Sequence, residues 1–266
     1  PGANSAPPMP ELPEVEVVRA GLEPAVTGAR VLAVSVLDER ALTRHSGSAE
    51  HFERELTGRR ISAAVRRGKF LWLPIDPLPI DPVPIDPENS APTEAVVAHL
   101  GMSGQLLLRE PGAPAERHER VRIDAQHPLH GEISVVFADQ RTFGSLALDA
   151  LVPTPHDAAG GRGSGLALVP TQVAHIARDP LDPAFDEKRF RAALARKSSG
   201  VKRVLLDQTV LSGVGNIYAD EALWAARIHP ETPAARLPTV TVRRLLAEIR
   251  TVLDKGRVGE TYNVGG

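Results

Sequence analysis

Pro10-Glu11 is the pair of residues in this chain with the most distinctive potential chemistry. It follows Met9, so removal of an initiator methionine there would expose a secondary amine beside a carboxylic acid. A free α-amine titrates near pH ~8, so part of it is unprotonated and nucleophilic at neutral pH. Its attack on a sugar aldehyde carbon would form an iminium, the electron sink that lysine usually supplies. Alternatively, a Pro-Glu pair is simply a favourable start for a helix.

Residues 1–8 precede this pair and have the composition of a disordered leader or an expression remnant. While they are attached, the Pro10 nitrogen is an amide and cannot act as a nucleophile. We expect Met9 to be the start of the natural protein, with Pro10 exposed after its removal.

Two further segments carry residues that suit contact with a polyanion or a duplex. Lys69 follows a glycine in Arg66-Arg67-Gly68-Lys69-Phe70, so it can reach a phosphate or a developing charge, or be an ordinary surface lysine. Met102 lies between two glycines in His99-Leu100-Gly101-Met102-Ser103-Gly104, a pattern typical of an exposed hairpin tip. A methionine there can insert into a duplex, as apolar side chains do in proteins that extract a base, or fold back onto its own sheet.

Two more turns have residue types that suit the same chemistry. In Asp139-Gln140-Arg141-Thr142-Phe143-Gly144, Arg141 and Phe143 lie two residues apart and share a side if the segment is extended. The arginine could hydrogen-bond an orphaned base while the phenylalanine wedges the stack; an ordinary loop is the alternative. In Gly213-Val214-Gly215-Asn216-Ile217-Tyr218, glycines leading into a helix expose backbone N–H groups that suit an anion, although a purely structural turn explains them equally well.

Charge is unevenly distributed in a chain whose net charge is −2. Residues 59–69 hold five basic side chains and residues 188–203 hold seven, Lys202 among them, and neither segment contains an acid. Two such segments suit a polyanion bound on one face, or they are solvated surface.

Composition excludes several other classes of protein. The chain has no cysteine, which excludes disulfides and every cysteine-containing zinc site. No apolar run approaches the ~20 residues that span a bilayer, and no secretory signal is visible at the start. We expect a cytoplasmic protein with no membrane partner.

The elements that position these residues divide into two parts. A helix is expected from Pro10, with Leu12, Val15, Val18 and Leu22 on one face and Gly21 with Pro24 ending it. Short β-rich runs then predict an antiparallel sandwich or barrel, with strands at 31–36, 61–65, 70–73, 95–100, 105–108, 121–124 and 133–137. A five-residue unit, Leu/Val-Pro-Ile-Asp-Pro, occurs three times in residues 73–87 and predicts an extended, solvated loop over 73–92.

The second part is predicted to be helical. Residues 151–183 are rich in Pro, Gly and Ala and favour an interdomain connection. Helices are expected at 186–196, 200–206, 219–226 and 239–255. The fold class is therefore α+β, with a catalytic β-sandwich domain at 9–150, a linker at 151–183 and a helical domain at 184–266.

The motifs together resemble the formamidopyrimidine-DNA glycosylase family. The resemblance runs from Met9 to about Gly266 and rests on PELPEVE, RRGK, HLGMSG, an Arg-x-Phe-Gly turn and DQxxxxGVGNIYADE, in the family's order. It implies a monomeric base excision repair enzyme of bacterial, nucleoid-associated type, with a helix-two-turns-helix domain. Such an enzyme removes oxidised purines from double-stranded DNA, 8-oxoguanine and formamidopyrimidines among them, and cleaves the abasic site by β,δ-elimination.

The resemblance also implies a role for each matching position. Pro10 would be the nucleophile that forms the Schiff base, Glu11 the acid that protonates the ring oxygen, and Glu14 a structural support. The residues that would hold phosphates around the lesion are Lys69, His99, Asn216 and Lys202, with Lys69 also serving catalysis. The residues that would fill the void left by the flipped nucleotide are Met102, Arg141 and Phe143.

Two departures from the family pattern bear on activity. The family typically ends in a structural zinc finger of four cysteines that contributes an arginine to the DNA backbone, and this cysteine-free chain stops about where the finger should begin. We expect an incomplete chain, with no cofactor and no metal ligands of its own. The leader before Met9 is the other departure.

Two other functions compete with this one. A catalytically silent protein that binds damaged DNA or abasic sites would show salt-sensitive binding without cleavage. A helical protein–protein adaptor would leave the Met102, Arg141 and Phe143 turns unexplained.

Overall fold

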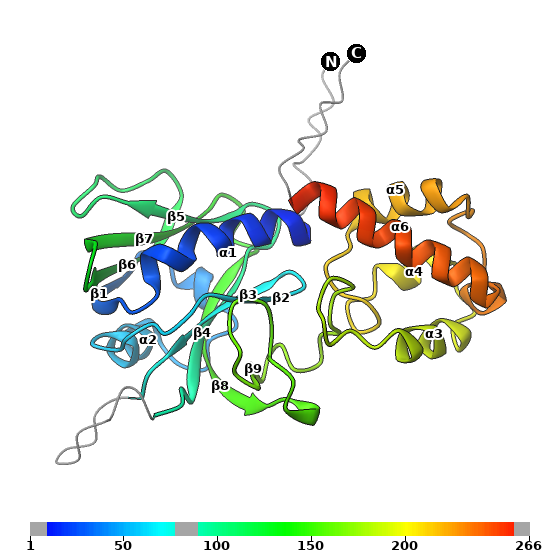
Figure 1. Ribbon diagram of the computed structural model, residues 1–266. Coiled ribbons are helices and arrows are strands. Elements are labelled where there is room, and N and C mark those ends of the chain that lie inside the picture. Colours follow the sequence, from blue (N-terminus) through cyan, green and yellow to red (C-terminus); the bar gives the residue numbers. More distant parts are fainter. Residues whose placement is uncertain (1–9, 78–89, 258–266) are drawn as a thin grey trace, which may run out of the picture. The chain divides into compact units, whose positions relative to one another are not determined.

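The computed structural model describes residues 10–77 and 90–257, so the leader at 1–8 and most of the proline-rich repeat lie outside the described residues. The chain divides into two compact units. Among the described residues, the sheet unit contains Val18–Arg66 and Phe70–Ala174, and the helical unit contains Pro10–Val17, Arg67–Lys69 and the chain from His175 onward. Each unit is built differently (Figure 1).

The sheet unit contains two antiparallel sheets. The first has the order β1-β6-β7-β5 and consists of Arg30–Val36, Glu119–His127, Gly131–Asp139 and Gly104–Arg109. The second has the order β2-β3-β4-β8-β9 and consists of Val65–Arg67, Phe70–Ile75, Glu94–His99, Ser145–Pro153 and Leu168–Pro170. The predicted fold class is confirmed for this half of the chain.

Alternation of side chains explains why these strands pair as they do. In β6, Val121, Ile123 and Ala125 are buried while the residues between them are more exposed, as expected when one face of a strand covers a core. β3 is buried along its whole length and reads as a continuous apolar run. The sheets therefore have an apolar interior that fixes the register of the strands ending at the candidate turns.

Helix α1, Leu12–Val26, is longer than predicted. The expectation that Gly21 and Pro24 end it is wrong, because Leu22 and Val26 are buried and hold the last turn in place. Gly21 is exposed with open space around it, and the helix ends at Val26, followed by a turn in which Gly28 has a φ of +87°.

Several short elements were missed or misplaced by the sequence pattern. Residues 61–65 do not form a strand: Ile61 forms an isolated bridge to Ile75, and β2 begins at Val65. Helix α2, Ala49–Leu56, capped by Ser48, was not predicted, nor were the 3₁₀ turns Glu39–Leu42 and Pro155–Asp157. Strand β8 runs to Pro153 and β9 lies within the stretch expected to be a linker.

The helical unit consists of α3 Glu187–Ala195, α4 Val201–Leu205, α5 Asn216–Ala226, the 3₁₀ turn Ala234–Arg236 and α6 Thr239–Arg257. Asp186 caps α3 by accepting a hydrogen bond from the Arg189 N–H at 3.0 Å. In α6, Val242, Leu245, Leu246 and Ile249 recur at helical spacing and are buried. All four predicted helices are confirmed, with α5 beginning three residues earlier than expected, at 216 rather than 219.

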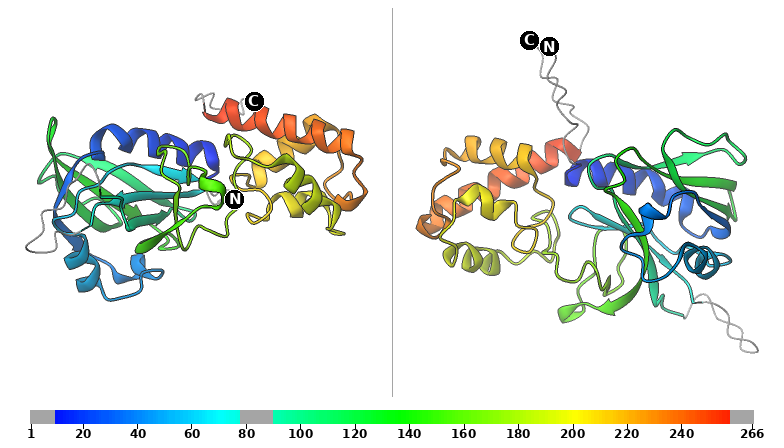
Figure 2. Two further views of the ribbon diagram at one scale, coloured as in Figure 1. Left: turned by 60° about the horizontal axis from the view of Figure 1, so that its bottom comes forward. Right: turned by 180° about the vertical axis from the view of Figure 1, so that it is seen from behind.

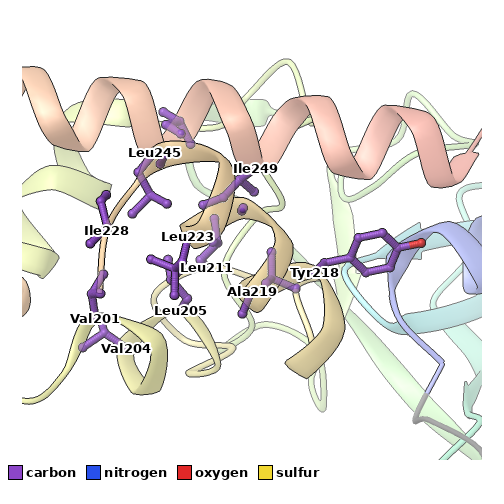
Figure 3. Close-up of a cluster of buried hydrophobic side chains, with 14 of the residues drawn as sticks. Val201, Val204, Leu205, Leu211, Tyr218, Ala219, Leu223, Ile228, Leu245 and Ile249 are labelled. Carbon is purple, nitrogen blue, oxygen red and sulfur yellow. The ribbon is translucent and has the colours of Figure 1, made fainter. Parts of the chain in front are cut away.

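A single apolar cluster holds these helices together, and α5 runs beside α6 (Figures 2 and 3). Ala219, Leu223 and Ile249 lie within it. Tyr218 lies at its edge, with its ring and hydroxyl turned away from the other labelled side chains (Figure 3). The phenol therefore remains available for polar contacts. Within the residues described, no helix is both long and apolar enough to cross a membrane.

Candidate active site

The glycine turn before α5 lies directly against the start of α1. The Leu12 N–H donates to the carbonyl of Gly213 at 3.0 Å, and a Cβ on Gly213 would approach Leu12 Cδ1 to 2.5 Å. A Cβ on Gly215 would collide with the Glu11 carboxylate. The two glycines of this turn are therefore needed for the close approach of α1.

Gln208 stabilises that turn from inside. Its Nε2 donates to the carbonyls of Leu206 and Val214, each at 3.1 Å, and its Oε1 accepts from the Gly213 N–H at 3.0 Å. One amide side chain thus satisfies three backbone groups that have no helical partner. The turn is a fixed support for Glu11.

Glu11 is 4% exposed, and its carboxylate lies at the N-terminus of α5. Its Oε1 accepts from the Tyr218 N–H at 3.5 Å, and the Gly215 N–H also hydrogen-bonds the carboxylate. Burial raises the pKa of Glu11 to about 7, because these N–H groups and the Lys69 charge, which lower it, only partly offset desolvation. A substantial share of Glu11 is therefore protonated at neutral pH and can donate a proton.

Glu14 connects the start of α1 to Tyr218. Its Oε2 accepts from the Glu11 N–H at 3.0 Å, as in a helix capping box, and its Oε1 accepts from the Tyr218 hydroxyl at 3.4 Å. Burial and then the Glu14 and Glu11 charges raise the pKa of the Tyr218 phenol, which stays a neutral donor. Tyr218 was missed by sequence reasoning, although its place two residues after Asn216 at the start of a helix was a usable signal.

Lys69 follows a glycine whose backbone lies close to the side chain of Ser212. Gly68 has a φ of +58°, and a Cβ there would lie 2.6 Å from both Cβ and Oγ of Ser212. Burial lowers the pKa of the Lys69 ammonium, while the carboxylates of Glu11 and Glu14 raise it. Lys69 therefore shares one electrostatic environment with both carboxylates.

The helical unit also contains Pro10, Asn216 and Lys202. Pro10 is half-buried and immediately precedes Glu11. Asn216 is exposed at the first position of α5, where backbone N–H groups lack helical partners. Lys202 on α4 pairs with Asp220 on α5, with Nζ and Oδ1 2.9 Å apart, a partner that sequence reasoning did not foresee.

The other four predicted residues lie in the sheet unit. His99 is at the end of β4, where its Nδ1 accepts from the Gly101 N–H at 3.2 Å and its ring packs against Phe70. Met102 is half-buried in the turn between β4 and β5. Arg141 and Phe143 are exposed in the turn between β7 and β8, Phe143 by 63%.

These two turns pack directly on each other. A Cβ on Gly101 would lie 2.7 Å from the Gly144 N and 2.8 Å from the Phe143 carbonyl carbon. The structure thus brings Met102, Arg141 and Phe143 into one neighbourhood of the sheet unit. Separately, it gathers Glu11, Glu14 and Lys69 in the helical unit.

The residues do not fit a four-cysteine zinc site, because the chain contains no cysteine. Across residues 10–77 and 90–257, no three His, Asp or Glu side chains form a group that could hold a metal ion.

Comparison with known proteins agrees with this geometry. Residues 9–146 match the formamidopyrimidine-DNA glycosylase N-terminal domain, and residues 176–262 match the H2TH domain of the same family. The chain therefore belongs to the formamidopyrimidine-DNA glycosylase family, as its motifs indicated.

Two curated relatives and two solved structures illustrate the similarity. The formamidopyrimidine-DNA glycosylase of Leifsonia xyli is 58% identical over 93% of this chain and 79% of its own length. The enzyme of Nocardioides is 51% identical over 92% of this chain and 73% of its own length. The Lactococcus lactis enzyme bound to AP-site DNA is 29% identical with a TM-score of 0.71, covering 93% of this chain and 82% of that one. Its complex with FAPY-dG DNA gives a TM-score of 0.70, at 29% identity over 93% and 80% of the two chains.

Proposed function

We propose that this protein is a base excision repair glycosylase and AP lyase that removes oxidised purines from duplex DNA, 8-oxoguanine and formamidopyrimidines among them. The observation that carries the proposal is the buried Glu11 carboxyl with a pKa of about 7, adjacent to Pro10 and close to Lys69. Family membership supports it, as do the DNA complexes of the Lactococcus lactis enzyme.

The proposed reaction begins at Pro10 and requires its nitrogen to be free after removal of Met9. The nitrogen lone pair attacks C1′ of the damaged nucleotide, forming a C–N bond as the glycosidic bond breaks and the base leaves with that electron pair and takes up a proton. Glu11 donates its proton to the sugar ring oxygen, the ring C–O bond opens, and an iminium joins Pro10 to C1′.

The iminium then drives strand cleavage. It acidifies the C2′ proton, whose removal expels the 3′ phosphate; loss of the C4′ proton similarly expels the 5′ phosphate. Hydrolysis of the remaining iminium by water returns the free amine of Pro10. Both phosphates leave with the electrons of their C–O bonds, so the sequence needs no oxidant or reductant.

The remaining predicted residues are proposed to bind the DNA. The residues assigned to phosphates are Lys69, His99, Asn216 and Lys202. The residues assigned to the void left by the flipped nucleotide are Met102, Arg141 and Phe143. The exposure of Arg141 and Phe143 at one turn supports this, since neither side chain serves the apolar core. We further propose a monomer acting on the chromosome in the cytoplasm, without a zinc ion held by these residues.

Borohydride trapping tests the proposal. Protein expressed from Met9 is incubated with an 8-oxoguanine duplex or an abasic-site duplex, reduced and digested. The expected result is one covalent adduct on the peptide that begins at Pro10, with strand cleavage when borohydride is omitted. Salt-sensitive duplex binding without adduct or cleavage would replace the proposal with a silent damaged-DNA binder.

A further inference from the structure

Asp139, the last residue of β7, has a carboxylate that accepts three hydrogen bonds. It is 1% exposed. Its Oδ1 accepts from the Ser103 hydroxyl at 2.6 Å and from the Arg141 N–H at 3.2 Å, and its Oδ2 accepts from the Gly144 N–H at 2.8 Å. One buried side chain therefore bonds to two different turns.

The two turns carry the three proposed wedge residues, half-buried Met102 and exposed Arg141 and Phe143. Ser103 follows Met102 in the turn between β4 and β5, and the bonds to the N–H groups of 141 and 144 enclose Thr142 and Phe143 in the turn between β7 and β8. The Ser103 hydroxyl also accepts from the Arg141 N–H at 3.2 Å. Hydrogen bonds of Asp139 and Ser103 thus connect the turn between β4 and β5 to the turn between β7 and β8.

The backbone of the turn between β7 and β8 needs such support. Thr142 has a φ of +55°, a left-handed conformation that β-branched residues rarely adopt and that persists only when its surroundings impose it. The backbone of Asp139 is itself fixed, since its N–H donates to the His118 carbonyl at 3.0 Å and its carbonyl accepts from Arg120 Nε at 2.9 Å. The carboxylate is therefore a rigid anchor on the sheet.

We propose that Asp139 is a positioning residue that joins the two turns into one wedge, so that Met102, Arg141 and Phe143 enter the duplex together. The inference rests on the proposed glycosylase function. Two independently moving turns would each lose conformational freedom on insertion, whereas a pre-joined wedge has already lost it on folding. Asp139 itself does not touch the DNA in this arrangement; it acts through the turns.

The test separates wedge insertion from the chemistry at Pro10. Asp139→Asn preserves shape but replaces one acceptor oxygen with a donor that faces an N–H or a hydroxyl. Ser103→Ala removes only the link between the turns. Asp124→Asn is the matched control, because Asp124 also accepts a hydrogen bond from a serine hydroxyl, Ser134 at 2.5 Å, between strands of the same unit and away from both turns.

Three measurements are made on each variant. Insertion is followed by the fluorescence of 2-aminopurine placed opposite an abasic site in a duplex. Excision of 8-oxoguanine is measured in single turnover opposite each of the four bases. Trapping by borohydride is measured on a single-stranded abasic oligonucleotide, which has no stacked partner strand to wedge apart.

For Asp139→Asn we expect duplex excision to fall by about tenfold to a hundredfold, as misplacement of a substrate-positioning group produces. The 2-aminopurine signal and the discrimination between opposite bases should fall with it, while single-stranded trapping stays within about twofold of the unsubstituted protein. Ser103→Ala should show the same pattern more weakly, and Asp124→Asn should show none of it.

Unchanged insertion and discrimination in Asp139→Asn would overturn the inference while leaving the proposed function intact. Equal losses on single-stranded and duplex substrates would also overturn it, since they indicate general damage. If Asp139→Asn does not fold, Ser103→Ala decides, and an unchanged duplex signal in that variant rejects the joined wedge. Failure of the unsubstituted protein to trap any substrate would instead refute the proposed function.

Discussion

The Glu11 carboxylate lies so close to Gly215 that no side chain fits between them. The glycine belongs to the turn that opens α5, and the carboxyl belongs to the residue that precedes α1. The position of the Glu11 carboxyl therefore depends on a glycine 204 residues further along the chain. Any side chain at Gly215 would push the carboxyl aside, because its Cβ would collide with it.

Gly215→Ala should displace Glu11 and lower excision and lyase rates by about a hundredfold, the cost of moving a catalytic group by an ångström. Gly165→Ala is the matched control, because a Cβ at Gly165 meets nothing within 4 Å and the residue has no left-handed φ. Single-turnover rates beside thermal melting curves check this. A normal rate in the Gly215→Ala variant would show that Glu11 needs no fixed position.

The activity that depends on Glu11 should decline as pH rises through about 7, because the carboxyl must be protonated to donate and its pKa is raised to about 7. Glu11→Gln should lower the rate and remove that alkaline decline. The pH profile of single-turnover cleavage measures both. A wild-type profile that stays flat from pH 6 to 9 would contradict the assignment of Glu11 as the acid.

The free energy of unfolding should also depend on pH through the Glu11 carboxyl, and the protein should be more stable at low pH than at high pH. The folded protein holds the Glu11 proton more tightly than the unfolded chain, where the pKa is 4.5, so the contribution to stability is full below about 4.5 and is lost as pH rises to about 7. The loss amounts to roughly 3 kcal/mol at most. Glu11→Gln should remove this slope, as measured by urea unfolding at pH 5 and pH 8.

Lys69→Met should shift the alkaline decline to higher pH, because the Lys69 charge lowers the pKa of Glu11 and its removal leaves burial less opposed. The same change should weaken DNA binding through loss of the proposed phosphate contact. Lys188→Met, an exposed position on α3, removes one positive charge elsewhere in the helical unit and is the control. A decline that stays at its wild-type position in Lys69→Met would show that the two groups are not coupled.

Asp220→Asn should strengthen duplex binding and steepen its salt dependence by about 0.9 in the slope of log K against log salt, because Lys202 no longer has to leave a carboxylate to reach a phosphate. Glu231→Gln, an exposed site in the same unit, makes the same charge change without the ion pair. Fluorescence anisotropy at several salt concentrations compares them. Equal slopes in both variants would assign the effect to net charge alone.

The sequence predicted the fold class because its periodicities are strong: alternating apolar residues in β6 and helical spacing in α6 both lead to buried faces. It failed where packing overrides local preference. Pro24 does not end α1, because burial of Leu22 and Val26 holds the helix beyond it. Likewise, α2 is only eight residues long, and it is held by burial of Ala49, Phe52 and Leu56.

The candidate site was likewise predicted in part from the sequence and missed in part. The motif around Gly213 and Gly215 indicated an anion-binding turn, but only the three-dimensional contacts show that the acidic side chain of Glu11 lies against it. Gln208, Tyr218 and Asp139 lie inside segments that the sequence singled out, yet those segments did not indicate the hydrogen bonds by which the three residues support the site. Their contacts join positions far apart in the chain or across a turn, and a linear pattern does not carry that information.

The contact between Glu11 and the N–H of Tyr218 spans 207 positions. During synthesis Glu11 therefore emerges from the ribosome long before the turn that buries it. Until that turn arrives, Glu11 is an ordinary solvated carboxylate that is ionised at neutral pH and has no proton to give. Glu11 can therefore hold a proton at neutral pH only when nearly all of the described chain has been made.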